Sequence, residues 1–229
     1  MQKEIGMISL PSDKYTLAWF KLADLVSRKE KEKAIGMYRL LAHSLNNEAM
    51  VAQLEGDLLL AFHDTKSLAS YERAALSYER QGKLTEAAAV YEHLCTLQPE
   101  CMHYVTILIK LYEKLAYESK IARSLCHLIR VLLKKGSLKE AHVLIENCML
   151  DLSYHVQLHE QFVISSADQT FYNHELVLEH LLLAIEGNLQ KESSENITAF
   201  MAKLLMINPD LYYQASAFLR ETELKADKK

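Results

Sequence analysis

The chain has 229 residues, of which 50% are hydrophobic, and carries a formal net charge of −4. That apolar fraction is enough for a buried core, but no segment carries the excess of lysine and arginine that nucleic acids or anionic membranes attract. No apolar run approaches the length of a membrane span, and the first residues lack the apolar core of a signal peptide. We therefore expect a cytoplasmic protein with no membrane insertion and no nucleic-acid partner.

Residues that break helices are scarce. Glycine occurs 6 times and proline 3 times, both far below ordinary usage, which favours long helices and short turns. Strictly alternating runs rich in Val, Ile and Thr are missing, so we expect an all-α chain without a large sheet. The 4 cysteines lie inside helical patterns, and we expect them to be reduced thiols.

The expected elements begin after a lead-in over residues 1–14. Pro11, Ser12 and Asp13 form a stop that is followed by a helix N-cap signal. The first unit, over 15–65, is expected to hold three helices at 15–28, 32–45 and 48–62, because apolar residues recur there at helical spacing.

Three further units repeat this plan over 66–118, 119–172 and 173–222. Gly82 and Gly136 occupy equivalent places, where a glycine C-cap ends a helix. The expected helices cover 66–81, 84–97 and 101–117, then 120–135, 138–150 and 153–166, then 174–187, 194–206 and 210–222. The repeat domain over 15–222 leaves no room for a second domain, and residues 223–229 form a charged tail.

A short pattern recurs at a wide and nearly fixed interval. Ala34, Ala87 and Ala141 lie 53 and 54 residues apart, and a fainter copy follows 56 residues later, around Ile197. Each of the three alanines is followed four positions on by a larger residue: Tyr38, Tyr91 and Ile145. Such a period predicts a helical array, which acts mainly through the surface that it presents.

These residues resemble the tetratricopeptide repeat, in which small residues let two helices approach and large ones fill the gaps on either side. The second unit matches best, with Tyr71, Ala74, Ala75, Tyr78, Gly82, Ala87, Tyr91 and Pro99. The first shows Trp19, Leu22, Ala23, Val26, Ala34 and Tyr38, and the third shows Leu125, Leu128, Ile129, Leu132, Gly136, Ala141 and Ile145. The resemblance implies an all-α, right-handed α-α superhelix (a solenoid) of about twelve antiparallel helices.

The period departs from that family, whose standard repeat has about 34 residues and two helices. Units of 53 to 56 residues hold a third helix, which shifts the pairing of consecutive helices. Helix 66–81 can pair with 48–62 or with 84–97, and both pairings stay open. A bundle like those of soluble membrane-fusion adaptors is a related possibility.

The resemblance also implies where a partner binds. In the family, the inner groove is lined by positions between the packing positions of the first helix of each repeat. On this chain these are Phe20, Asp24 and Arg28, then Glu72, Leu76, Glu79 and Arg80, then Arg123, Cys126, Arg130 and Lys134. The acidic stretch followed by a basic one suits a peptide of mixed charge. A clamp for a C-terminal carboxylate is doubtful, because Phe20, Asp24 and Cys126 occupy the matching positions.

Candidate catalytic or metal-binding residues are few. His155 and His159 lie one helical turn apart, but no third ligand is evident and the order is not that of a zinc motif. Cys95 and Cys101 suit small packing residues, and Cys126 and His127 point about 100° apart on a helix, so they cannot form a catalytic pair. A metal-dependent hydrolase or redox protein is therefore the least favoured interpretation, and we expect no cofactor.

The leading hypothesis is a non-catalytic scaffold that binds a peptide or helix of a partner protein in its concave groove. The alternative is a structural protein that self-associates through its terminal repeats, because the last helix carries apolar residues around its circumference. Those residues are Leu211, Tyr212, Tyr213, Phe218 and Leu219.

Overall fold

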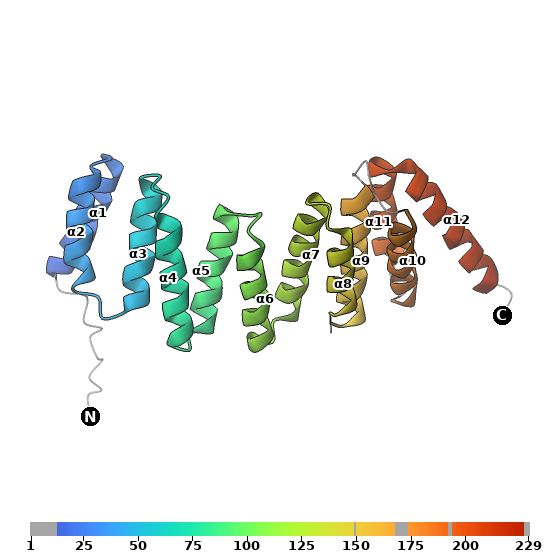
Figure 1. Cartoon of the computed structure of the whole chain (residues 1–229), viewed down its shortest axis with the longest axis horizontal. Coiled ribbons are helices and arrows are strands. Elements are labelled where there is room, and N and C mark those ends of the chain that lie inside the picture. Colours follow the sequence, from blue (N-terminus) through green and yellow to red (C-terminus); the bar gives the residue numbers. More distant parts are fainter. Residues whose placement is uncertain (1–12, 149, 168–173, 192–193, 227–229) are drawn as a thin grey trace, which may run out of the picture. The chain divides into compact units, whose positions relative to one another are not determined.

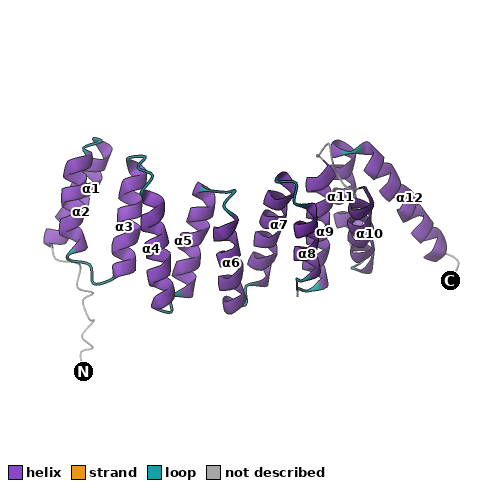
Figure 2. Cartoon of the chain, in the orientation of Figure 1, coloured by secondary structure: helices purple, strands orange, loops and turns teal. Residues whose placement is uncertain are grey.

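The computed structural model describes residues 13–148, 150–167, 174–191 and 194–226. Within these ranges the chain forms twelve helices and no strand, which confirms the expected all-α class (Figure 1, Figure 2). The first six are α1 (Asp13–Ser27), α2 (Lys31–Ala42), α3 (Glu48–Ala61), α4 (Ser67–Arg80), α5 (Leu84–Leu97) and α6 (Met102–Leu115). The others are α7 (Glu118–Lys134), α8 (Leu138–Glu146), α9 (Leu152–Ala167), α10 (His174–Gln190), α11 (Ser194–Ile207) and α12 (Pro209–Ala226).

Every described helix lies at a predicted place, and most ends differ from prediction by a few residues. The largest differences are at the ends of α8 and α12, and α8 ends at Glu146 instead of continuing to residue 150. Asn147 is its C-cap, and its amide Nδ2 donates to the carbonyl of Val143 at 2.9 Å. Helix α12 begins at Pro209, whose fixed φ suits the first helical position, and continues to Ala226, four residues past the predicted end at residue 222.

Local sequence explains several helix ends. Asn47 caps α3, because its Oδ1 accepts the backbone N–H of Ala49 at 3.0 Å. Gly82 and Gly136 follow α4 and α7 with φ of 73° and 77°, so both predicted glycine stops are confirmed. Ala116 ends α6 in the same left-handed region, with φ of 54°.

The helices divide into two compact units, one ending at Pro99 and the other beginning at Glu100. In the first unit, α1, α2 and α3 enclose a core of the residues Ala18, Leu22, Leu25, Ala34, Tyr38, Leu41 and Leu58. Ala34 and Leu41 are fully buried, so the repeated alanine is a packing position, as predicted.

Helix α4 packs closely against both α3 and α5. A Cβ placed on Gly56 of α3 would lie 2.8 Å from ring carbons of Tyr71, so only glycine permits this approach. The Tyr71 hydroxyl donates to Asp57 at 2.7 Å, and the Tyr78 hydroxyl donates to Gln53 at 3.2 Å. Helix α4 therefore makes both of the pairings that the sequence left open, with α3 and with α5.

In the second unit the helices alternate between two layers. Helix α9 packs against α7 and α11 in one layer, while α10 packs against α12 in the other. Two contacts between α7 and α9 have the same sequence separation of 31 residues, Cys126 to Gln157 and Arg130 to Gln161, so these two helices run parallel. Among the described helices, none combines the length and the apolar character that crossing a membrane requires.

Candidate functional site

The positions predicted to line a groove are divided between the two units. On α1 the Phe20 ring is 71% exposed and follows Leu17, which is 69% exposed. Asp24 and Arg28 are also exposed, and they form an i,i+4 ion pair at 3.1 Å. The α1 positions therefore lie at the surface of the first unit, with a small apolar patch beside a neutral ion pair.

The α4 positions are less accessible. Arg80 is exposed and Leu76 is 47% exposed, whereas Glu72 and Glu79 are half-buried. Glu79 accepts a hydrogen bond from the buried hydroxyl of Tyr91. Burial is the main cause that raises the pKa of this tyrosine, and the nearby negative charge of Glu79 raises it further. Glu79 is thus engaged within the helix pair α4 and α5.

On α7, Arg123, Arg130 and Lys134 are exposed, as a binding surface requires. The Arg130 guanidinium donates to Oε1 of Gln161 on α9 at 3.2 Å, and Lys134 lies 3.8 Å from Glu100. Cys126 differs from the prediction, because it is buried and its Sγ lies 4.0 Å from the carbonyl oxygen of Gln157. Cys126 therefore belongs to the packing of α7 on α9 and lines no groove.

A polar pocket of about 370 Å³ lies beside this row, between α9, α10 and α11. Its lining comprises Tyr154, Val156, Gln157, Glu160, Asn188, Lys191, Asn196, Ala199, Phe200 and Lys203. Gln157 lines the pocket, and its backbone carbonyl lies near Cys126 of α7. One helical turn further along both helices, Arg130 donates to Gln161. We call the surface that carries Arg130, Gln157, Glu160, Gln161 and Lys203 the α7–α9–α11 face.

Glu160 is held in place at this pocket. The Asn188 side chain is 1% exposed, and its Nδ2 donates to Glu160 Oε1 at 2.7 Å and to the Ala184 carbonyl at 3.0 Å. Burial raises the pKa of Glu160, while Asn188, Lys203 and Lys191 act in the opposite direction. Burial likewise lowers the pKa of Lys191, and Glu160 opposes that shift. The pocket thus combines partly dehydrated charges of both signs.

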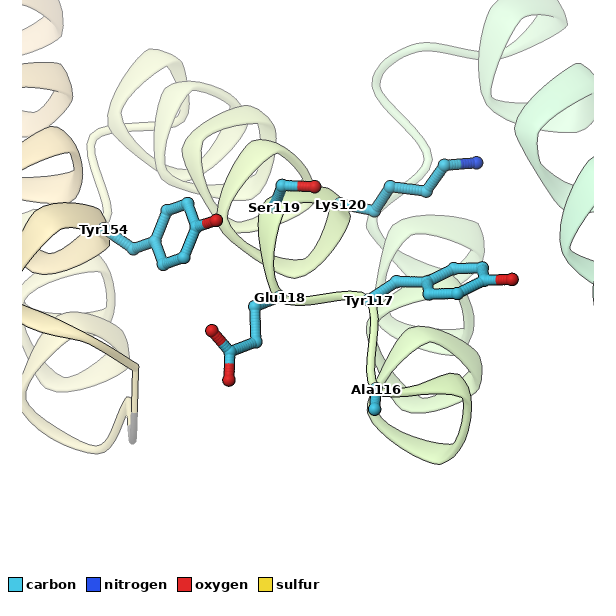
Figure 3. Close-up of a pocket in the computed structure, with 6 residues that line it drawn as sticks. All are labelled: Ala116, Tyr117, Glu118, Ser119, Lys120 and Tyr154. Atoms are coloured by element: carbon cyan, nitrogen blue, oxygen red, sulfur yellow. The ribbon is translucent and has the colours of Figure 1, made fainter.

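A second hollow of about 440 Å³ lies where α6 passes into α7, and Tyr154 of α9 lines this hollow as well as the polar pocket. Figure 3 shows the Tyr154 phenol reaching toward the start of α7, near Ser119 and Glu118, while Tyr117 and Lys120 point to the other side. The Lys120 ammonium lies 5.2 Å from the centre of the Tyr112 ring. Tyr154 therefore stands between two depressions of the second unit.

A chain of histidines joins α8, α9 and α10 inside the same unit. His142 Nδ1 lies 3.0 Å from His180 Nε2, and His159 Nδ1 lies 2.6 Å from His180 Nδ1. His180 is fully buried, His159 is 8% exposed, and the Phe162 ring stacks on His180 at 3.9 Å. Neutral imidazole has one donor and one acceptor nitrogen, so an uncharged His180 can satisfy both contacts by donating to one neighbour and accepting from the other.

His159 is therefore a buried packing residue in this row of three histidines. Each ring nitrogen of His180 faces a different histidine, so the three rings do not converge on one point. Across the described residues, no three His, Cys, Asp or Glu side chains come together in a way that would hold a metal ion. His142 and His180 were not singled out in the sequence, where 38 residues separate them and no local pattern links them.

None of the four cysteines, all at described positions, forms a disulfide. Burial raises the pKa of Cys126 to about 11, which disfavours the thiolate that nucleophilic chemistry needs. Cys95 and Cys101 are half-buried in the two units, consistent with the expected packing role.

A scan against protein-family models found no match to this chain, and a search of curated proteins found none either.

Proposed function

We propose that the protein is a non-catalytic interaction scaffold that binds a peptide or helix of a partner protein on the α7–α9–α11 face. The observation that carries the proposal is the polar pocket between α9, α10 and α11. Its lining residue Gln157 lies one helical turn from Gln161, to which the exposed Arg130 donates. A row of amides and charges along parallel helices suits a ligand that is itself an extended chain of amides.

The packing of the second unit supports a tetratricopeptide-like plan. Helices alternate between two layers, and facing residues on α7 and α9 are 31 residues apart, close to the standard repeat of about 34. On this proposal the helices follow the right-handed α-α superhelix of that family, and the layer of α7, α9 and α11 forms its inner surface.

The chemistry of the face suits binding. The side-chain amides of Gln157, Gln161 and Asn196 offer both donors and acceptors to a peptide backbone. Phe200 and Tyr154 provide apolar surface in the pocket lining. Arg130 offers a positive charge at the edge, where charge mainly selects the partner and speeds the encounter. The exposed Arg123 and Lys134 extend the same positive row along α7.

Affinity capture from the native cell, followed by mass spectrometry, tests this function. We expect wild-type protein to retain a partner that Arg130→Glu loses, because the change reverses a charge on this face. Arg39→Glu is the matched control, since Arg39 is exposed on α2 in the first unit and we expect its capture pattern to equal that of wild type. Equal capture by both variants and wild type would contradict the assignment of this face.

Self-association through the C-terminal helices is a second candidate. Met206 at the end of α11 is 87% exposed and Tyr213 on α12 is 66% exposed, so apolar surface is accessible there. Leu211, which the sequence placed on this apolar surface, is fully buried and does not contribute. Light scattering over a range of protein concentrations separates the two functions, because a monomer at every concentration would exclude self-association.

The predicted contacts on the first unit remain predictions. Phe20 is the strongest of them, since an exposed aromatic ring is a typical anchor for a partner. Asp24, Arg28, Glu72, Glu79 and Arg80 complete that set.

A further inference from the structure

Helix α7 carries positive side chains along one of its sides. It holds four lysine and arginine residues and a single glutamate, in a chain whose net charge is −4. Arg123, Arg130 and Lys134 are seven and four residues apart, so they follow one another along the same side, and all three are exposed. We call these three residues the α7 row. At a rise of 1.5 Å per residue, the row is about 16 Å long.

The charges of the two arginines are not neutralised within the described part of the chain. Arg123 has no acidic partner there, and Arg130 donates to the uncharged amide of Gln161 at 3.2 Å. Lys134 lies 3.8 Å from Glu100, but both side chains are largely exposed to water, where an ion pair contributes little. The α7 row is therefore open to a negatively charged ligand.

Helix α9 adds no negative charge beside the α7 row. The two contacts between α7 and α9 share a separation of 31 residues, which places Tyr154, Gln161 and Ser165 level with the three cations. All three of these neighbours are polar and uncharged. Glu160 is the only acidic residue of α9, and its Oε1 accepts a hydrogen bond from the buried Asn188 on α10. Its carboxylate is thus engaged at α10.

The other sides of α7 differ from the α7 row. Glu118, the only acidic residue of the helix, precedes Arg123 by five residues and lies about 140° from it around the helix axis. Leu128 lies about 160° from Arg130, and with Leu125 it lines an apolar hollow of about 450 Å³ between α6, α7 and α8. The positive charge of α7 is therefore confined to one side.

We propose that the α7 row binds an acidic segment of a partner protein, with separate carboxylates of that segment meeting Arg123, Arg130 and Lys134. The two arginines are about 10 Å apart along the helix axis, so they select a segment with several acidic residues over a single carboxylate. A guanidinium group suits this role, because its donors match both oxygens of a carboxylate. This inference rests on the proposed function of the α7–α9–α11 face, and it adds the chemical class of the ligand.

Charge also separates an acidic protein segment from other polyanions. Nucleic acids and anionic membranes attract a broad excess of positive charge, whereas this chain is negative as a whole. A short acidic segment can follow the row without meeting the rest of the surface. The hydroxyl and amide groups of Tyr154, Gln161 and Ser165 beside the row also suit the backbone of a peptide. A basic segment is disfavoured, because like charges at an interface cost binding free energy.

Fluorescence anisotropy of the full chain with labelled probes tests the proposal. Three peptides of equal length share a Gly, Ala and Ser background and an amidated C-terminus, and they are acidic, basic or neutral. A neutral peptide with a free C-terminal carboxylate and a deoxythymidine oligonucleotide complete the set. We expect the acidic peptide to bind most tightly, and its affinity to weaken markedly between about 0.05 and 0.5 M salt because salt screens exposed charges.

The decisive variant combines Arg123→Glu with Arg130→Glu. Two attractions become repulsions, so we expect the acidic peptide to bind at least roughly tenfold more weakly, and the basic peptide to bind more tightly than it does to wild type. Lys110→Glu combined with Lys139→Glu is the matched control, because it makes the same change in net charge. Both lysines are exposed and line hollows around α6 and α8, and the hollow of Lys110 includes Leu128 on the opposite side of α7.

We expect this control to change the affinity for the acidic peptide by less than about twofold, since salt screens distant charges. Thermal unfolding of both double variants checks that the fold is intact. Equal weakening by the two double variants would show a general charge effect and overturn the proposal. Tightest binding of the basic peptide, of the free carboxylate terminus or of the oligonucleotide would also overturn it.

Failure of this inference can be told from failure of the proposed function. An acidic peptide that does not bind overturns the inference, whereas the proposed function stands as long as Arg130→Glu still loses a partner in the cell capture. No binding of any peptide, together with capture that Arg130→Glu leaves unchanged, would overturn both.

Discussion

His180 of α10 lies between two other histidines, with its Nδ1 at 2.6 Å from Nδ1 of His159 and its Nε2 at 3.0 Å from Nδ1 of His142. The arrangement joins three helices through two hydrogen bonds, each of which needs one neutral acceptor nitrogen. Protonation of His180 would make both of its nitrogens donors, which leaves a buried charge and permits both bonds only if both neighbours act as acceptors.

The first prediction is a loss of stability in mild acid. Burial, and then the neighbouring histidines, lower the pKa of His159 to about 4 and that of His180 to about 3 in the folded protein. An unfolded histidine titrates near pH 6.5, so below that value the unfolded state binds more protons and stability falls as the pH falls toward the folded values. We expect the free energy of unfolding to fall by roughly 3 kcal/mol between about pH 7 and pH 5.

Urea unfolding at the two pH values measures this loss, with hydrogen exchange as the probe for the helices of the second unit. His180→Phe removes one of the two groups, so we expect a smaller dependence on pH even though the variant is less stable. His103 is exposed on α6, and His103→Ala is the control that should keep the wild-type dependence. A wild-type stability that is unchanged across this interval would contradict the prediction.

The second prediction concerns the approach of α9 to α10. A Cβ on Gly187 would overlap the side chain of the buried Val156, so Gly187→Ala forces one helix away from the other. We expect a cost of about 1 to 3 kcal/mol, typical of overpacking. Gly36 on α2 has open space around it, and Gly36→Ala should be neutral or stabilising by up to about 1 kcal/mol. In calorimetry, the melting temperature of Gly187→Ala should therefore fall, whereas that of Gly36→Ala should stay the same or rise.

The third prediction tests the α3 and α4 interface of the first unit. Tyr71→Phe removes the hydroxyl that donates to Asp57 while it keeps the ring that packs on Gly56. We expect a loss of about 1 to 2 kcal/mol, because the acceptor is a carboxylate. Tyr213→Phe changes a hydroxyl on a side chain that is 66% exposed and should have almost no effect. Equal melting temperatures for Tyr71→Phe and wild type would rule out a stabilising role for this bond.

The fourth prediction ranks the thiols by reactivity. Cys126 is buried against α9 and burial raises its pKa to about 11, whereas Cys95 and Cys101 are half-buried. We expect Cys126 to react last with a thiol reagent in the native protein, and all four to react alike in denaturant. Mass spectrometry of partly labelled protein identifies the order, and early labelling of Cys126 would show that α7 and α9 separate readily.

Helix positions followed closely from local sequence. Glycine stops, an asparagine cap and a proline at a helix start act through the few residues around them, so a pattern of neighbours is enough to predict them. The exposure of Arg123, Arg130 and Lys134 on α7 was also predictable, because they fall on the side of the helix away from its buried residues. Cys126 was placed wrongly, since helical periodicity cannot show that α9 covers that part of α7.

The sequence alone determined that the described chain is all-α, where each described helix lies to within a few residues, and that Ala34, Ala87 and Ala141 are packing positions. Only the tertiary structure decided which helices share a layer, and it brought Glu160, Asn188 and Lys203 to one pocket and three histidines into one chain. The physical reason is the distance along the sequence over which the deciding interactions act. Helix formation and capping depend on residues within about one turn, whereas these sites need side chains from separate helices whose pairing depends on the packing of whole faces.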